Sequence, residues 1–223
     1  MLGPLPPGPY GGVVRGVPWW GVISSAAAPV LLVGGWRLAA ALQPGSYNEV
    51  TRTVSALASA GAADRWVMTL AFVIVGTCDV LTALALRPAA APGRLILIAG
   101  GIAGMLVAAS PDHGGGGSLA HVLWAAVGFA ALTAWPVGSC RRGRRVPWGL
   151  RPRLSSAVAC VLLGLLGWFL VELIYGGGQV GLAERILGAA QALWPLLVVL
   201  SCRQNRAQAR ALTADAASAE IRN

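Results

Sequence analysis

Long runs of apolar residues dominate the pattern of hydrophobic and polar positions along the chain. Because an α-helix rises about 1.5 Å per residue, roughly 20 apolar residues cross the hydrocarbon core of a bilayer. The pattern predicts an all-α, polytopic membrane protein, an antiparallel bundle of six transmembrane helices with a short extracytoplasmic surface helix. In the third run, Gly100 and Gly104 have GxxxG spacing, which predicts the close approach of a neighbouring helix. The predicted spans are residues 17–42, 66–86, 95–109, 119–137, 155–174 and 182–202.

Composition supports the membrane assignment. Of the 223 residues, 56% are hydrophobic and 11% are charged, whereas soluble domains carry about 25% charged residues. The chain is interpreted as one transmembrane domain, residues 17–202. A Pro/Gly-rich N-terminal segment, residues 1–16, precedes this domain, and an arginine-containing tail, residues 203–223, follows it.

The basic residues are distributed unevenly among the connections between spans. The connections after the second and fourth spans and the tail hold most of the arginines, whereas residues 110–118 and 175–181 hold none. By the positive-inside rule, the arginine-rich connections lie in the cytoplasm. The pattern therefore predicts a multi-pass protein of the plasma membrane with both termini cytoplasmic. This topology accounts for the net charge of +9, so we expect no nucleic-acid partner.

A group of polar residues in the outer half of the predicted bundle is not needed for this topology. Charges within spans are costly and usually face a partner or a water-filled cavity. We interpret the group as an outward-facing polar pocket for a lipid or small molecule. The alternative is that these charges lie at the membrane interface, with Arg37 extending outward past Trp36. The pocket candidates are Arg37, Glu49, Arg52, Asp112, His113, His121, Glu184 and Arg185.

Asp79 differs from this group in its depth. It lies about 13 residues into the second predicted span, roughly 20 Å from the outer end. This depth places an acid in the hydrocarbon region. One interpretation is a structural hydrogen bond to Thr77, to Thr82 or to a facing span. The other is a role for Asp79 in binding a proton or a ligand.

The segment between the first two spans, residues 44–68, is too polar to cross the membrane and too regular for a slack loop. Ser46 and Glu49 have the spacing of a capping box. An apolar stripe follows at helical spacing. Its positions are Val50, Val54 and Leu57. The pattern predicts a helix of about 12 residues on the outer surface, which is either a simple spacer or a wall of the outward-facing site.

The sequence contains no recognisable catalytic or metal-binding motif. The four cysteines form no CxxC pair and no pattern with histidine, so no metal site is expected. His113 and His121 are close in sequence, and His113 precedes a run of glycines, which does not favour haem. We expect no cofactor. The catalytic option that stays open is acid–base chemistry by Glu49, His121 or Glu172.

Five segments spread over about residues 45–200 share their order, spacing and wording with one known family. They are SYNEVTRTVSALASAGAADRWVMT, GTCDVLTALALRP, PGRLILIAGGIAG, SPDHGGGGSLAHVLWAAVGF and GLAERILGAAQALWP. On these segments the chain resembles the DUF998 family of bacterial integral membrane proteins and, more distantly, the Frag1/DRAM/Sfk1 membrane proteins. The resemblance draws attention to Ser55, His121 and the Glu184–Arg185 pair, so Ser55 joins the pocket candidates. It implies a multi-span fold and no activity, because the family name itself records an unknown function.

Three hypotheses of function remain. The first is a membrane protein that binds a lipid or small molecule in the outward-facing pocket and has an accessory or regulatory role in the cell envelope. The alternative is a small intramembrane enzyme that acts on a lipid or isoprenoid by acid–base chemistry. The second alternative is a proton-linked transporter with Asp79 as its proton site. Membrane lipids are partners in all three, and a membrane-protein partner or a homo-oligomer stays open.

Overall fold

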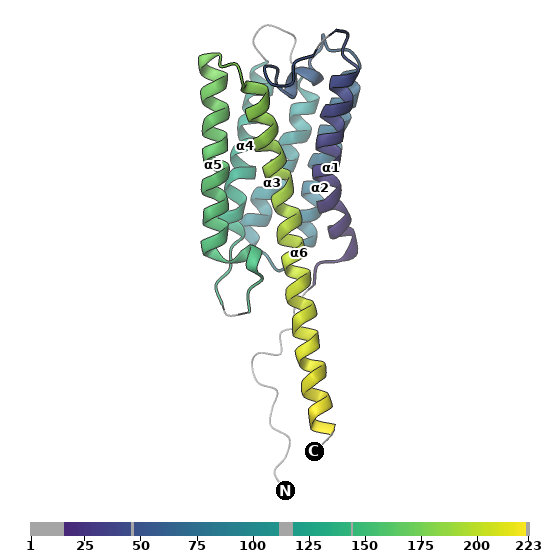
Figure 1. Cartoon of the computed structure of the whole chain (residues 1–223), viewed down its shortest axis with the longest axis vertical. Coiled ribbons are helices and arrows are strands. Elements are labelled where there is room, and N and C mark those ends of the chain that lie inside the picture. The colour runs from purple at the N-terminus through teal and green to yellow at the C-terminus, as the bar shows by residue number, and fades with distance from the viewer. Residues whose placement is uncertain (1–15, 46, 112–117, 144, 222–223) are drawn as a thin grey trace.

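The computed structural model describes residues 16–45, 47–111, 118–143 and 145–221. This part of the chain contains six helices that are long and apolar enough to cross a membrane, and it contains no strand. The helices run alternately up and down in one bundle, and α1 begins at the same end at which α6 leaves it (Figure 1). They are α1 (Trp19–Ala41), α2 (Trp66–Ala85), α3 (Ala91–Ala109), α4 (Leu119–Ser139), α5 (Pro152–Tyr175) and α6 (Val180–Ile221). The predicted all-α, six-span architecture is confirmed.

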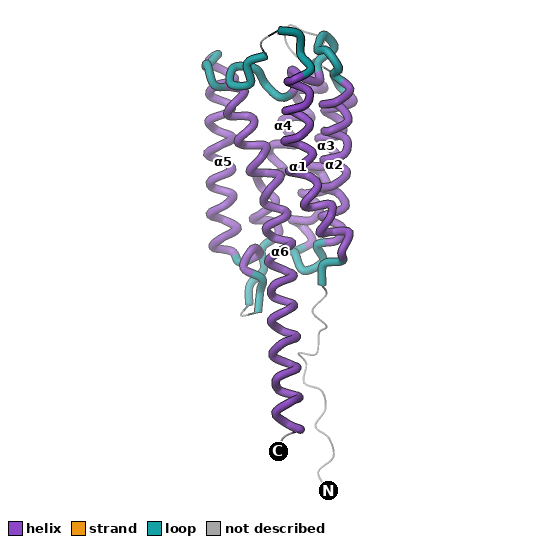
Figure 2. The backbone as a smooth tube through the Cα atoms, turned by 45° about the vertical axis from the view of Figure 1, so that its right-hand side comes forward, coloured by secondary structure: helices purple, strands orange, loops and turns teal. Residues whose placement is uncertain are grey.

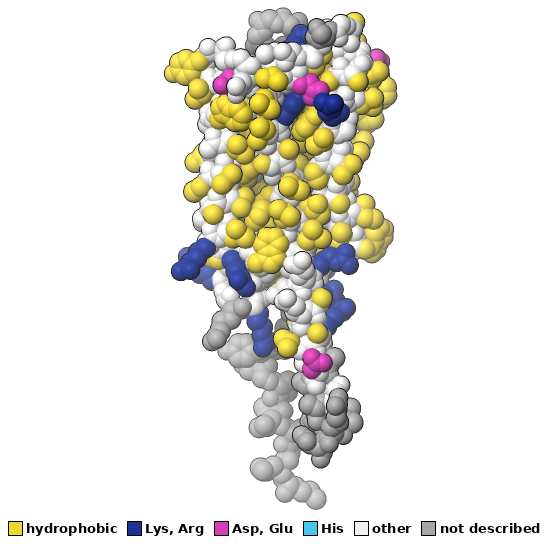
Figure 3. Space-filling model, viewed as in Figure 1, with side chains coloured by type: hydrophobic (Ala, Val, Ile, Leu, Met, Phe, Trp, Pro, Cys, Tyr) yellow, Lys and Arg dark blue, Asp and Glu magenta, His cyan; other side chains and the backbone are white. Residues whose placement is uncertain are grey.

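The two ends of the bundle differ in charge. A band of apolar side chains separates many arginines at one end from a small group of acidic and basic side chains at the other (Figure 3). We call the end at which α1 begins the arginine-rich end. Arg94 there donates hydrogen bonds to the carbonyls of Ala83 (2.8 Å) and Leu84 (3.4 Å), which cap the last turn of α2. The described arginines at or beyond this end are Arg87, Arg94, Arg141, Arg142, Arg145, Arg151, Arg153, Arg203, Arg206 and Arg210.

The last helix is much longer than the predicted sixth span. α6 has 42 residues, so it is about 63 Å long. It continues past residue 202 and extends well beyond the bundle (Figure 2). The arginine-containing tail is therefore helical as far as Ile221.

Several helix ends are set by residues with a strong local preference. Ser118 precedes α4, and its hydroxyl accepts the backbone N–H of His121 at 3.2 Å, which caps the helix. Pro152 begins α5, at a position where a missing N–H costs nothing. Gly176 ends α5 with a φ of +68°, a left-handed conformation that glycine adopts without strain.

Two glycines bring α2 and α3 into backbone contact. A Cβ at Gly76 would overlap the carbonyl oxygen of Gly101, and a Cβ at Gly101 would overlap that of Gly76. Gly100 likewise lies against Leu132 of α4, as the GxxxG spacing led us to expect. Gly104, one turn further along α3, faces open space instead.

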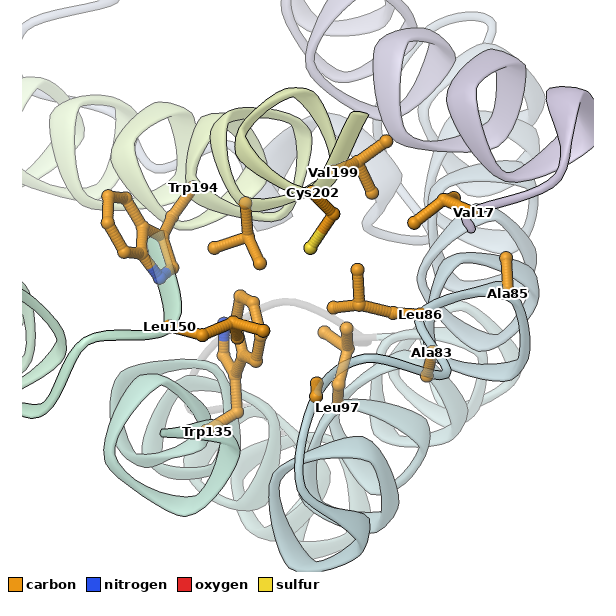
Figure 4. Packing of buried hydrophobic residues seen from close by; sticks show 12 residues of the cluster. Val17, Ala83, Ala85, Leu86, Leu97, Trp135, Leu150, Trp194, Val199 and Cys202 are labelled. Atoms are coloured by element: carbon orange, nitrogen blue, oxygen red, sulfur yellow. The ribbon is translucent and has the colours of Figure 1, made fainter. Parts of the chain in front are cut away.

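A large apolar core lies near the arginine-rich end. Trp135 of α4 and Trp194 of α6 pack around Leu150, with Cys202 beside them (Figure 4). Leu150 belongs to a short 3₁₀-helix, Trp148–Leu150, in the connection between α4 and α5. This connection therefore folds back and closes the arginine-rich end of the bundle.

α5 lies at the edge of the bundle, beside α4 and α6 (Figure 1). Of its 24 residues, Ser155, Leu162 and Phe169 are buried. The ring of Phe169 packs against that of Phe129 in α4, with the ring centroids 5.3 Å apart. Because only these three residues of α5 are buried, most of its surface is available to lipid.

The segment between α1 and α2 corrects the prediction of a surface helix. Instead of a helix of about 12 residues, the helical part is one short 3₁₀-helix, Ser55–Ala58. The carbonyl groups of Glu49, Val50 and Arg52, which an α-helix would use internally, accept hydrogen bonds from α6. Ser46, the first residue of the proposed capping box, lies outside the described residues.

We expect Gly101→Ala to destabilise the bundle, because its methyl group would force α2 away from α3 at Gly76. Overpacking of this kind costs about 1–3 kcal/mol, and thermal unfolding of the detergent-solubilised protein measures it. Gly167→Ala in α5 is the matched control, since a Cβ there meets nothing within 4 Å. Equal unfolding temperatures for the two variants would contradict the α2–α3 contact.

Candidate functional site

A cavity of about 640 Å³ lies in the half of the bundle opposite the arginine-rich end. All six helices contribute to its wall, and Thr53–Ser55 of the α1–α2 connection form its roof. Most of the wall is apolar, with contributions from Leu32, Trp36, Phe72, Val75, Val107, Phe129, Leu166, Phe169 and Ala192. The polar lining residues are Thr53, Ser55, Asp79, His121, Glu184 and Gln191.

The roof is bound to the first turns of α6 through its main chain. The carbonyl of Val50 accepts hydrogen bonds from the N–H groups of Gly181 (2.9 Å) and Leu182 (3.1 Å). The buried carboxylate of Glu184 accepts a hydrogen bond from the N–H of Val54. The α1–α2 connection is therefore fixed to α6 at two points, Val50 and Val54, both of which precede the 3₁₀-helix.

Arg185 of α6 reinforces the same contact. Its Nη1 donates to the carbonyl oxygens of Glu49 (2.7 Å), Arg52 (2.8 Å) and Gly181 (3.0 Å). Its Nε lies 3.5 Å from one carboxylate oxygen of Glu49, and the other oxygen lies 2.7 Å from Nη1 of Arg37. One buried guanidinium group thus joins three carbonyls and an acidic side chain.

We call the contacts of Glu184 and Arg185 with residues 49–54 the roof clasp. The side chain of Arg185 is 7% exposed, whereas that of Arg37 is 67% exposed. Water and salt screen an exposed ion pair, so it contributes little, whereas removing one partner of a buried pair is costly. The stability of the roof therefore depends on Arg185 far more than on Arg37.

Gly181 makes the close approach of α6 to the roof possible. A Cβ at this position would overlap the carbonyl oxygens of Arg52 and Glu49. Tyr47 also supports the roof: its hydroxyl donates to the carbonyl of Thr53 at 2.8 Å, and the Arg52 guanidinium lies 5.4 Å from its ring centroid. Burial raises the pKa of the Tyr47 phenol, so this hydroxyl stays protonated and able to donate.

His121 and Gln191 of the lining also have partners within the protein. Nδ1 of His121 lies 3.0 Å from the carbonyl oxygen of Ser110, and since a carbonyl can only accept, we assign a proton to Nδ1. Gln191 donates through Nε2 to the carbonyl of Phe129 (3.1 Å) and to the hydroxyl of Thr133 (3.1 Å). These bonds fix the orientation of His121 and Gln191 in the cavity wall.

Asp79 lies at the inner end of the cavity and is 4% exposed. Its carboxyl group has no hydrogen-bond or ion-pair partner among the described residues. The two threonines considered as partners bond elsewhere: Thr77 donates to the carbonyl of Val73 at 2.8 Å, and the hydroxyl of Thr82 lies 2.9 Å from that of Ser24. A buried acid without a partner therefore lines the deepest part of the cavity.

The cavity extends sideways into the groove between α4 and α5. Its lining on α4 runs from the inward-facing His121 and Gly128 round the helix to Val122 and Ala126. On the other side of the groove, α5 contributes one face that ends at Leu173. Val122 is 51% exposed and Leu173 is 52% exposed. The cavity is therefore covered by the roof but open sideways between α4 and α5.

One protein-family model matches most of the chain that forms this architecture. The model described as "Protein of unknown function (DUF998)" matches residues 26–201. The chain belongs to the DUF998 family. Neither a search of curated proteins nor a search of solved structures found a match. The cavity and the roof clasp both lie within the DUF998 region, whereas the α6 extension beyond residue 202 lies after it.

The structure divides the predicted site residues of this DUF998 protein into separate groups. Those that line the cavity are Ser55, Asp79, His121 and Glu184. Those that lie in or beside the roof clasp, outside the cavity lining, are Arg37, Glu49, Arg52 and Arg185. Glu172 lies at the α5–α6 turn, where its carboxylate accepts the N–H of Gln179 at 2.9 Å. Asp112 and His113 lie outside the described residues.

Some lining residues were not among the sequence candidates. Gln191 is an amide inside the apolar run of the sixth span, and that position is a detectable signal. Trp36 and Gly104 carry no such signal, because an aromatic residue and a glycine are common in spans. Their place in the lining depends on which neighbours leave space beside them.

We expect Arg185→Leu to release the roof, because three carbonyls and Glu49 lose a buried partner. Breaking a buried charge contact of this kind costs about 3–5 kcal/mol. Trypsin cleavage after Arg52 reports the release, since this bond lies within the clasped segment. Arg37→Leu is the control, because it removes only an exposed pair with the same Glu49. Equal cleavage rates in both variants would refute the roof clasp.

Proposed function

We propose that this DUF998 protein binds a lipid or a small amphiphilic molecule in the cavity beneath the roof. The observation that carries the proposal is the cavity itself, with its volume of about 640 Å³. Ligand pockets commonly have volumes of about 300–1,000 Å³ and are mostly apolar with a few placed polar groups. The lining has this character, and its opening between α4 and α5 gives a bilayer component direct access.

We place the protein in the plasma membrane with its arginine-rich end in the cytoplasm. The arginines at that end support this orientation, since cytoplasmic connections carry an excess of basic residues. In this orientation the roof clasp and the cavity face outward. The extension of α6 then lies in the cytoplasm. The chain also enters the transmembrane domain from the cytoplasm, so both termini are on that side.

We assign the protein an accessory or regulatory role in the cell envelope. α6 supports this assignment, because one continuous helix carries Glu184 at the roof, Gln191 in the cavity wall and the extension beyond residue 202. A ligand that changes the contacts of Glu184 or Gln191 acts directly on the helix that reaches the cytoplasm. Membrane lipids and a protein that contacts the α6 extension are the partners this role needs.

The enzymatic alternative has less support. Of its three candidate acid–base residues, Glu49 and Glu172 lie outside the cavity lining and bind groups of the protein itself. His121 lines the cavity, but it does so without either of those carboxylates. The residues singled out for catalysis therefore do not share one site.

Proton-linked transport is the second candidate, and the position of Asp79 at the inner end of the cavity favours it. A transporter needs the bound proton to pass from one side of the membrane to the other. Voltage-driven acidification of proteoliposomes that is lost in Asp79→Asn would support transport. Acidification at the same rate in empty liposomes and in proteoliposomes would reject it.

Filling the cavity tests the proposed binding. Gly104 lines the cavity, and a Cβ there meets nothing within 4 Å, so Gly104→Leu places a side chain in the open space. We expect native mass spectrometry of the purified protein to show a bound lipid or small molecule that Gly104→Leu lacks. Gly167→Leu is the control, because Gly167 also faces open space but lies outside the lining. An unchanged bound mass in Gly104→Leu would contradict binding in this cavity.

A further inference from the structure

Asp79 is the acid of the cavity lining whose charge nothing in the described residues balances. Glu184, the other lining carboxylate, accepts the N–H of Val54 and is adjacent to Arg185. Asp79 has neither a hydrogen-bond donor nor a basic side chain beside it in the described part of the chain. A buried polar group without a partner is destabilising, and a charged one more so. The position is therefore expected to be completed by something other than the protein.

The surroundings of Asp79 leave room for such a group. The crossing of α2 and α3 at Gly76 and Gly101 brings the two backbones together, and the Cβ of Asp79 would lie 3.1 Å from a Cβ at Gly101. Gly100 and Gly104 of α3 line the cavity and add no side chain to it. The carboxyl group thus lies at the end of a space bordered by glycines.

Most of the cavity wall is apolar, and the polar side chains of His121 and Gln191 are already bonded within the protein, which argues against water as the partner. Val75, Leu132 and Leu166 line the cavity with Asp79 and offer no polar side-chain atom. A buried water needs about two to four polar partners to be held in place. An ammonium group on an apolar chain meets the requirement better, because it brings both the donors and the opposite charge, while its chain contacts the walls.

We propose that Asp79 is the counter-ion for the protonated amine of an amphiphile, whose apolar chain lies along the cavity between α4 and α5. This inference rests on the proposed function and names the chemical class of the ligand. Acids within membrane spans pair with cations or act as counter-ions of bound ligands. The sideways opening at Val122 and Leu173 lets such an amphiphile enter from the bilayer while the roof clasp stays closed.

Matched probes test the assignment. The full chain in lipid nanodiscs is titrated with dodecylamine, dodecanol or dodecane, and native mass spectrometry gives the relative affinity of each. We expect dodecylamine to bind at least about tenfold more tightly than dodecanol, as a charge-assisted hydrogen bond allows. Asp79→Asn keeps the shape of the side chain, removes its charge and is expected to abolish this preference. Glu172→Gln removes a carboxylate outside the lining and is expected to keep it.

A second measurement does not depend on a variant. Dicyclohexylcarbodiimide reacts with carboxyl groups in apolar surroundings, and peptide mass spectrometry locates the adduct. We expect dodecylamine to protect Asp79 of the wild-type protein from this reagent, and dodecanol at the same concentration to leave it reactive. Equal protection by both probes would overturn the counter-ion assignment.

The outcomes separate this inference from the proposed function. If all three probes bind with equal affinity and Gly104→Leu blocks them, the cavity binds amphiphiles but Asp79 does not select an amine, so the inference fails alone. If no probe binds the wild-type protein, the proposed function fails. A dodecylamine preference that persists in Asp79→Asn also overturns the inference.

Discussion

The roof of the cavity depends on one buried guanidinium group. Arg185 donates to the carbonyls of Glu49, Arg52 and Gly181 with a single nitrogen, and it also faces the carboxylate of Glu49. These contacts keep the α1–α2 connection from forming its own helical hydrogen bonds and hold Thr53–Ser55 over the bundle. Without them the space beneath would be an open funnel rather than a covered cavity with a side opening.

Glycines determine where the bundle is tight and where it is open. Gly76 and Gly101 close the α2–α3 crossing, so Asp79 is held at the end of the cavity. Gly104 on the same helix lines the cavity, and a Cβ there would meet nothing within 4 Å. Glycine thus allows close helix contact in one place and leaves open space in another. The neighbouring residues decide which of the two occurs.

The sequence alone predicts the six spans well. A run of about 20 apolar residues that crosses a bilayer must bond its own backbone groups, and an α-helix does so within one segment. It misses the structure of residues 47–58, since Val50, Val54 and Leu57 have helical spacing but the nearby carbonyls are taken by α6. It gathers the polar candidates in one half of the bundle, and those that the structure describes lie in the half that holds the cavity. It cannot separate Arg185 in the clasp from Glu184 at the cavity, because adjacent helix positions differ in direction and the facing partner decides their roles.

We propose that the cavity beneath the roof clasp holds an amphiphile from the bilayer. Crystals grown in a lipid mesophase, with electron density calculated before any ligand is built, test it most directly. We expect elongated density that runs from the groove between α4 and α5 to the carboxyl group of Asp79. Side chains that collapse to fill the cavity, or isolated water peaks within it, would rule out a bound amphiphile.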